Sequence, residues 1–129
     1  NPTIVAASQY VLDTVKEGMV EMVTGSGLAT RAFSAFPTGC VAAKTGTPET
    51  GLEAFGQSSH SVFICYAPAN DPEIAVSIVV EHGAAGGNSI PMAGKIFEAY
   101  FYGKTLDEGS FDVKTAQKLE NRMLRKLAA

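Results

Sequence analysis

The chain has little cysteine and little histidine, the residues that most often hold metal ions or form cross-links. Its 129 residues include only Cys40, Cys65, His60 and His82 from these two types. Two cysteines are too few for a disulfide framework, and the four residues lack the close paired spacings of a zinc site. We expect no metal site and no cofactor. Buried free thiols fit the cysteines better than a disulfide between strands or thiol chemistry, and local hydrogen bonds fit the histidines better than acid–base roles.

Long apolar runs and blocks of like charge are also absent. No stretch approaches the roughly 18 apolar residues that cross a bilayer, and residues 1–20 lack the charged and apolar regions of a signal peptide. The net charge is -3 and is spread along the chain, which argues against a nucleic-acid surface or a basic membrane-binding patch. The sequence therefore predicts no nucleic-acid partner and no membrane segment of its own.

The apolar content is sufficient for one domain or part of one, because 46% of the residues are hydrophobic. Ser8 can cap an N-terminal helix that ends near residues 24–27, and residues 25–38 are expected to form a loop. The apolar residues of the helix recur at helical spacing and predict an amphipathic helix against a core. They are Leu12, Val15, Met19, Met22 and Val23.

Three runs rich in β-branched residues follow, at 39–47, 60–67 and 73–81. Turn-forming residues at 68–72 join the second run to the third, which predicts an antiparallel hairpin. Pro48 closes the first run, because proline cannot donate to a strand ladder. Together the runs predict a three-stranded antiparallel meander.

The C-terminal part begins with a glycine-rich link at 83–88, which we expect to be flexible because it lacks the spacing of a phosphate-binding loop. Ser89 can cap a helix that lies on the sheet, and a last helix is expected from about Asp112 in a polar segment. The apolar residues are Ala93, Ile96, Phe97, Tyr100 and Phe101 in the first helix, and Ala116, Leu119, Met123 and Leu127 in the second. Residues 126–129 resemble the start of an expression-vector addition, and we assign them no function. The predicted class is α+β: an antiparallel sheet with N- and C-terminal helices packed on it.

The residues with the clearest chemistry end the first predicted strand, at Lys44-Thr45-Gly46-Thr47. A lysine attracts a carboxylate over a distance, the Thr45 hydroxyl adds a directional hydrogen bond, and Gly46 lets a substrate backbone approach closely. The backbone N–H of Thr47 can then stabilise a developing oxyanion, and one such donor is commonly worth about 3 kcal/mol. We predict substrate binding by the first three residues and a catalytic oxyanion-hole role for the fourth.

Residues 41–47, Val-Ala-Ala-Lys-Thr-Gly-Thr, resemble the third-strand signature of the penicillin-recognising serine acyltransferases, whose motifs are Ser-x-x-Lys, Ser-x-Asn and Lys-Thr-Gly. Residues 60–68 are similar to the next strand of that family. Glu81-His82-Gly83 and residues 89–93 are similar to the last strand and C-terminal helix of class B penicillin-binding proteins. The resemblance covers about residues 8–102. It implies a partial β-lactamase/transpeptidase-like fold, with 1–102 as the C-terminal portion of a transpeptidase domain and 103–129 as a polar tail.

The resemblance also implies that the parent protein is a peptidoglycan D,D-transpeptidase that binds penicillin. In that family a serine attacks the bond between two D-alanines, forms an acyl-enzyme and passes the acyl group to an amine. The implied partners are a stem peptide ending in D-alanyl-D-alanine, or a β-lactam, and the N-terminal half of the same domain. The implied location is the extracytoplasmic face of a bacterial membrane, reached through an N-terminal anchor of the parent.

The chain departs from the family pattern because neither Ser-x-x-Lys nor Ser-x-Asn occurs in it. The nucleophile and its base are missing, so we expect the chain alone to have no acyltransferase activity. Two alternatives stay open. One is a serine β-lactamase or β-lactam sensor, since both share Lys-Thr-Gly, and the other is a non-catalytic subdomain that folds or binds partners.

Overall fold

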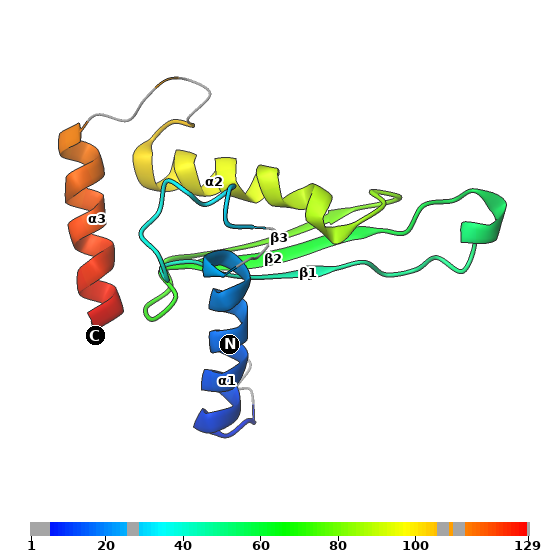
Figure 1. Cartoon of the computed structure of the whole chain (residues 1–129), viewed down its shortest axis with the longest axis horizontal. Helices are drawn as coiled ribbons and strands as arrows, with labels where there is room; N and C mark the ends of the chain where they lie inside the picture. Colours follow the sequence, from blue (N-terminus) through cyan, green and yellow to red (C-terminus); the bar gives the residue numbers. More distant parts are fainter. Residues whose placement is uncertain (1–5, 26–28, 106–108, 110–112, 129) are drawn as a thin grey trace.

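The computed structural model describes residues 6–25, 29–105, 109 and 113–128. Three strands and three α-helices make up most of this part, with two short 3₁₀ turns (Figure 1). In chain order they are α1 (Gln9–Thr24), β1 (Ala42–Gly46), η1 (Glu53–Phe55), β2 (Ser61–Ala67), β3 (Ile74–Val80), η2 (Gly86–Ser89), α2 (Ile90–Tyr102) and α3 (Val113–Ala128). The predicted α+β class is confirmed.

The sheet is antiparallel throughout and has the order β1-β2-β3, so the predicted meander is confirmed. Lys44 of β1 pairs with Ile64 of β2, and Val62 of β2 pairs with Val79 of β3. The first strand begins later than predicted. Cys40 N–H donates to Pro37 O, and its carbonyl accepts from Ala69 N, so Cys40 bonds outside the ladder.

The core lies between the sheet and α2, which runs along one face (Figure 1). Alternate residues of β2 are buried on this face, and Phe63 is fully buried. The predicted loop at 25–38 contributes Phe33 and Phe36, whose rings lie 5.5 and 6.2 Å from the ring of Phe97 in α2. This aromatic cluster ties a segment without regular structure to the sheet and the helix.

The buried face of α2 is rotated from the predicted one. The buried residues of α2 are Ile90, Ala93, Gly94, Phe97 and Glu98. Ile96 and Tyr100, predicted to face the core, are 41% and 53% exposed. Gly94 explains the rotation, because its backbone packs closely against the carbonyl group of Ala32 and leaves no room for a side chain there.

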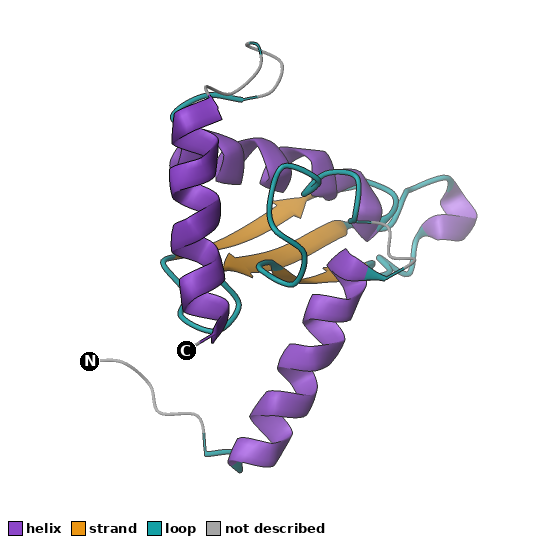
Figure 2. Ribbon diagram, turned by 60° about the vertical axis from the view of Figure 1, so that its left-hand side comes forward, coloured by secondary structure: helices purple, strands orange, loops and turns teal. Residues whose placement is uncertain are grey.

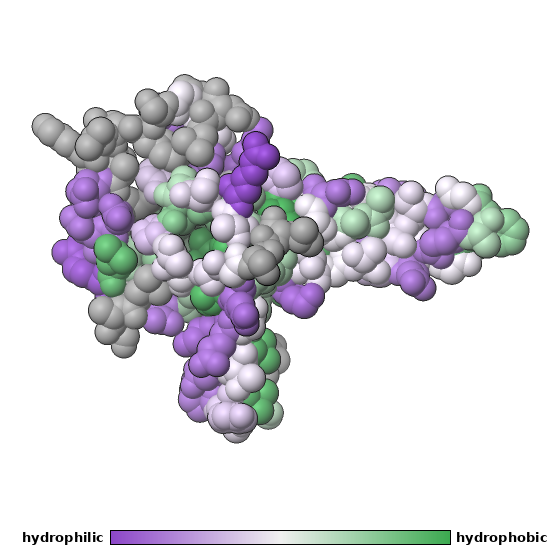
Figure 3. All heavy atoms as spheres, viewed as in Figure 1, coloured by the Kyte–Doolittle hydropathy of each residue, from purple (hydrophilic) through white to green (hydrophobic). Residues whose placement is uncertain are grey.

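Helix α1 begins as predicted, since Ser8 Oγ accepts a hydrogen bond from Val11 N at 3.4 Å. The predicted packing against a core is found only at its C-terminal end, where Val23 joins the core and Met22 packs against it. The helix points away from the sheet on the side opposite α2 (Figure 1), and Val23 near its end is its buried residue. Leu12 is 42% exposed and Val15 57%, which leaves an apolar stripe along the helix (Figure 3).

The link at 83–88 was predicted to be flexible and contains hydrogen-bonded structure, because it ends in η2. Asn88 Nδ2 donates to Gly83 O at 2.8 Å, and Ala84 N donates to Ser59 O at 2.9 Å. Ser89 occupies the N-cap position of α2, as predicted, but its side chain caps no helix N–H. Its hydroxyl group instead contacts Ser61.

Helix α3 lies beside the end of α2 and the β2–β3 turn (Figure 2). Met123 is fully buried, Arg122 forms an ion pair with Glu73, and Lys126 Nζ lies 2.6 Å from Asp71. The predicted start at Asp112 and the side chains of Ala116, Leu119 and Leu127 lie outside what the structure describes. In the described part of the chain, none of the helices combines the length and hydropathy needed to span a membrane.

Candidate functional site

The Lys-Thr-Gly residues end β1, as predicted, and β1 is an edge strand of the sheet. Thr47 follows directly and begins the long connection to β2. An edge strand has one side that is not paired within its sheet, and an extended peptide can add there as a further strand. The fold therefore puts the motif where an extended substrate could lie beside it.

Lys44 and Thr45 lie on opposite faces of the sheet, because side chains alternate along a strand. Lys44 is opposite Ile64, which is 44% exposed, so the lysine lies on the face away from α2. Its Nζ donates to Thr45 O at 2.7 Å, which holds the ammonium group close to the strand. Thr45 is opposite the buried Phe63 and is itself partly exposed.

Gly46 lies between β2 and η2. A Cβ atom at position 46 would be 3.4 Å from Val62 Cβ, and one at position 86 would press on the backbone of Gly46, 2.9 Å from its nitrogen. The backbone of Gly86 therefore rests on the backbone of Gly46. The sequence motif predicts close approach by a substrate, and the structure adds a close approach by the chain's own η2.

Thr47 makes a contact that the sequence does not reveal. Its Oγ1 accepts a hydrogen bond from Gly86 N at 3.0 Å. The two residues are 39 positions apart, and the glycines at 83, 86 and 87 were the available signal for a close approach between backbones. The oxyanion-hole role of the Thr47 backbone N–H stays a prediction.

The two histidines have local partners, which confirms the interpretation that they are satisfied by hydrogen bonds. His82 N donates to His60 Nδ1 at 3.0 Å, and His82 Nδ1 lies 2.9 Å from Ser58 O. Because a carbonyl oxygen can only accept, His82 Nδ1 carries the proton in that bond. These contacts tie the end of β3 to the segment before β2.

Both cysteines are free and buried, which confirms the interpretation of them as buried thiols. Burial raises the pKa of the Cys40 thiol to about 11 and that of Cys65 to about 12. Thiols with such pKa values are protonated and weakly nucleophilic near neutral pH. Neither cysteine therefore supplies a nucleophile to replace the missing serine.

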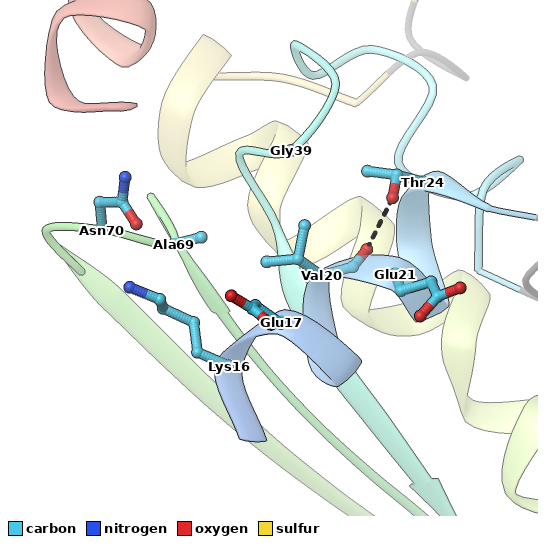
Figure 4. A pocket seen from close by; sticks show the side chains of 8 residues that line it. All are labelled: Lys16, Glu17, Val20, Glu21, Thr24, Gly39, Ala69 and Asn70. Carbon is cyan, nitrogen blue, oxygen red and sulfur yellow. Dashed lines mark hydrogen bonds between the residues drawn. The ribbon is translucent and has the colours of Figure 1, made fainter. Parts of the chain in front are cut away.

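A hollow of about 340 Å³ lies between α1 and the β2–β3 turn (Figure 4). Lys16 and Glu17 of α1 face Ala69 and Asn70 across it. The residues that line it include none from 44–47. The hollow is therefore separate from the candidate site on β1.

Comparison with known proteins supports the same assignment. The family described as the penicillin binding protein transpeptidase domain matches residues 2–102, which is most of the chain. The chain belongs to this family. The predicted resemblance to class B penicillin-binding proteins is thereby confirmed, and α3 lies beyond the matched residues.

The relatives that this chain matches are much longer than the chain itself. The peptidoglycan D,D-transpeptidase PbpA of Mycobacterium tuberculosis is 30% identical over 92 residues, which is 67% of this chain and 19% of PbpA. The peptidoglycan D,D-transpeptidase MrdA of Acinetobacter baumannii is 30% identical over 98 residues, or 65% of this chain and 14% of MrdA. The chain thus spans less than a fifth of these relatives.

Solved structures agree with the fold. Pseudomonas aeruginosa PBP2, in complex with WCK 5153, superposes with a TM-score of 0.64 at 30% identity over 88% of this chain and 23% of its own. PBPA from Mycobacterium tuberculosis gives a TM-score of 0.58 at 32% identity, over 73% of this chain and 23% of PBPA. A ceftriaxone acyl-enzyme of penicillin-binding protein A from the same species gives a TM-score of 0.56 at 33% identity, over 73% of this chain and 22% of its own.

Proposed function

We propose that the chain is the C-terminal portion of the catalytic domain of a peptidoglycan D,D-transpeptidase. The observation that carries this proposal is the place of Lys44-Thr45-Gly46 at the end of an edge strand, within residues that match the transpeptidase family. In the reaction a serine attacks the carbonyl of a D-alanyl-D-alanine bond, and D-alanine leaves. The acyl-enzyme then transfers its acyl group to an amine of a neighbouring stem peptide.

Each residue of the motif has a role in this proposal. Lys44 attracts the substrate or β-lactam carboxylate. Thr45, whose side chain leaves the other face of this edge strand, binds the substrate through a hydrogen bond from its hydroxyl group. The Thr47 N–H stabilises the oxyanion that develops on the attacked carbonyl. Support comes from the named relatives, which are transpeptidases, and from the ceftriaxone acyl-enzyme among the similar structures. These comparisons favour a transpeptidase over a β-lactamase or sensor.

The nucleophile comes from outside this chain, because the chain has no Ser-x-x-Lys. We infer that the N-terminal half of the same domain supplies it and packs on the exposed face of the sheet beside Lys44. Ile64, in the middle of β2, and Val79, near the end of β3, are 44% and 64% exposed on that face and form an apolar surface there. The complete enzyme acts on the extracytoplasmic side of the membrane, where peptidoglycan lies.

The test is the rate at which a fluorescent penicillin acylates the full-length enzyme that contains this chain. Replacing Lys44 by glutamine should slow acylation by about a hundredfold, because a charge that orients the carboxylate is lost. Lys16→Gln on α1 is the matched control and should react at the unmodified rate. Equal rates for Lys44→Gln and the unmodified enzyme would refute the role of Lys44, and no acylation of the unmodified enzyme would refute the proposed function.

A further inference from the structure

The turn η2 is attached to the sheet at two points. It lies over the ends of β1 and β2, next to the candidate site. The first attachment is to β1, where Gly86 N donates to Thr47 Oγ1 at 3.0 Å. Gly86 is buried there, and a Cβ atom on it would collide with the backbone of Gly46. A shift of η2 would therefore move Gly46 and Thr47, or lose their contact.

The second attachment is to β2, through two serine hydroxyl groups. Ser61 Oγ and Ser89 Oγ lie 2.5 Å apart, and both residues are completely buried. Hydroxyl groups in a buried position need a hydrogen-bond partner, and each of these supplies one to the other. Ser61 opens β2, and the next residue, Val62, pairs with Gly46. The serine pair is thus one residue away from the pairing that places Gly46.

The backbone around the serine pair leaves little freedom for η2 to settle elsewhere. A Cβ atom at Gly83 would lie 2.7 Å from Ser61 Cβ, so the chain passes directly over Ser61 as it enters η2. Ser89 is the last residue of η2 and precedes the buried Ile90 of α2. The chain is therefore held just before η2 by the packing of Gly83 on Ser61, and at the end of η2 by the hydroxyl contact.

We propose that Ser61 and Ser89 are positioning residues for the transpeptidase site, acting through η2. Their contact holds η2 on the sheet and so keeps Gly86 packed on Gly46. This packing fixes the end of β1, where the Thr47 N–H is a donor of the proposed oxyanion hole. Displacement of a catalytic group by about 1 Å can cost up to about a hundredfold in rate. The catalytic consequence rests on the proposed function, whereas the effect of the serine pair on Gly86 and Thr47 does not.

The first experiment follows the backbone amides by ¹⁵N NMR in the 129-residue chain. Ser89→Ala should shift the amide resonances of Thr47 and Gly86, and should raise the hydrogen-exchange rate of Gly86 at least about tenfold. Ser77→Ala, at an exposed serine in the middle of β3, is the matched control and should change neither amide. Unchanged Thr47 and Gly86 amides in Ser89→Ala would overturn the proposal.

The second experiment measures acylation by the fluorescent penicillin in the full-length enzyme. Ser89→Ala should slow acylation about tenfold, and Ser89→Thr, which restores a hydroxyl group, should recover most of that loss. Met123→Ala in α3 lowers stability far from the site and should keep the unmodified rate. The role of the serine pair is overturned if Ser89→Ala reacts at the unmodified rate, or if Met123→Ala is slowed equally. If the unmodified enzyme fails to react, the proposed function is refuted instead. The NMR experiment then tests on its own whether the serine pair positions Gly86 and Thr47.

Discussion

At the scale of single residues, the site depends on contacts between backbones as much as on side chains. Gly86 rests on Gly46 with no space for a methyl group between them. Gly18, in the exposed part of α1, is the opposite case, because a Cβ atom there would meet nothing within 4 Å. An added methyl group should therefore lower the stability of the chain at position 86 and not at position 18, and this difference can be measured.

We expect Gly86→Ala to lower the free energy of unfolding by about 1–3 kcal/mol, because the added methyl group displaces η2 or β1. Gly18→Ala should raise it by up to about 1 kcal/mol, since alanine is the better helix former. Urea denaturation of the two variants and the unmodified chain measures both. A Gly86→Ala variant as stable as the unmodified chain would contradict the close packing of η2 on β1.

The two buried thiols give a prediction about alkaline pH. Burial raises the pKa of Cys40 from 9.0 to about 11 and that of Cys65 from 9.0 to about 12. A raised pKa means that the folded state retains the proton while the unfolded thiol ionises, so their contribution to stability is complete below pH 9 and falls as the pH rises toward 11–12. Unfolding followed from pH 8 to pH 11 should show this loss.

The matching control is reactivity with a thiol reagent at pH 8. Both cysteines should react slowly in the native chain and rapidly in urea, because buried protonated thiols are poor nucleophiles. Rapid labelling of either cysteine without denaturant would show that its thiol is accessible in the folded chain, and would contradict the burial described above.

At the scale of elements, the sequence was sufficient to predict every α-helix and strand, because each has a clear apolar period or β-branched run. What the sequence did not reveal depends on contacts distant in sequence. The link at 83–88 looks flexible because its glycines carry no side chains to pack, yet it is held by Thr47, Ser59 and Ser61. Residues 29–37 lack a period, and still place two phenylalanines in the core. At the site, the motif predicted the place of residues 44–47, and only the fold brings η2 to them.

Helix α3 is held to the β2–β3 turn by charge as well as by Met123. Partial burial opposes ionisation of Glu73, but hydrogen bonds from Lys126 and Arg122 outweigh it and hold its pKa below the usual 4.5. A lowered pKa means that the contribution to stability is present above pH 4.5 and is lost as the pH falls below that value. Docking of α3 should therefore weaken in acid.

Replacing Glu73 by glutamine should lower the free energy of unfolding by about 1 kcal/mol at pH 7 and by much less at pH 3. The exposed Glu49 provides the control, because Glu49→Gln changes the same net charge far from α3. Thermal unfolding at both pH values gives the comparison. An equal effect of the two substitutions at pH 7 would show that the ion pairs do not hold α3.

At the scale of the whole molecule, the exposed apolar surfaces fit a domain that continues beyond this chain. The first is the stripe on α1, which includes Leu12 and Val15, and the second is the sheet face with Ile64 and Val79. Helix α1 lies on the side of the sheet opposite α2 (Figure 1), and the face that carries Ile64 also carries Lys44. Since the chain spans about a fifth of its relatives, we infer that the remainder of the domain covers these surfaces.

The most direct test of this account is the intact mass of the purified chain after incubation with excess benzylpenicillin, alone and mixed with the N-terminal half of the domain. We predict no adduct on the chain alone, since it has no Ser-x-x-Lys. We also predict acylation of the N-terminal half only when the chain is present, because residues 44–47 complete its site. A penicillin adduct on the isolated chain would contradict the account, as it would show that one of the chain's own residues is the nucleophile.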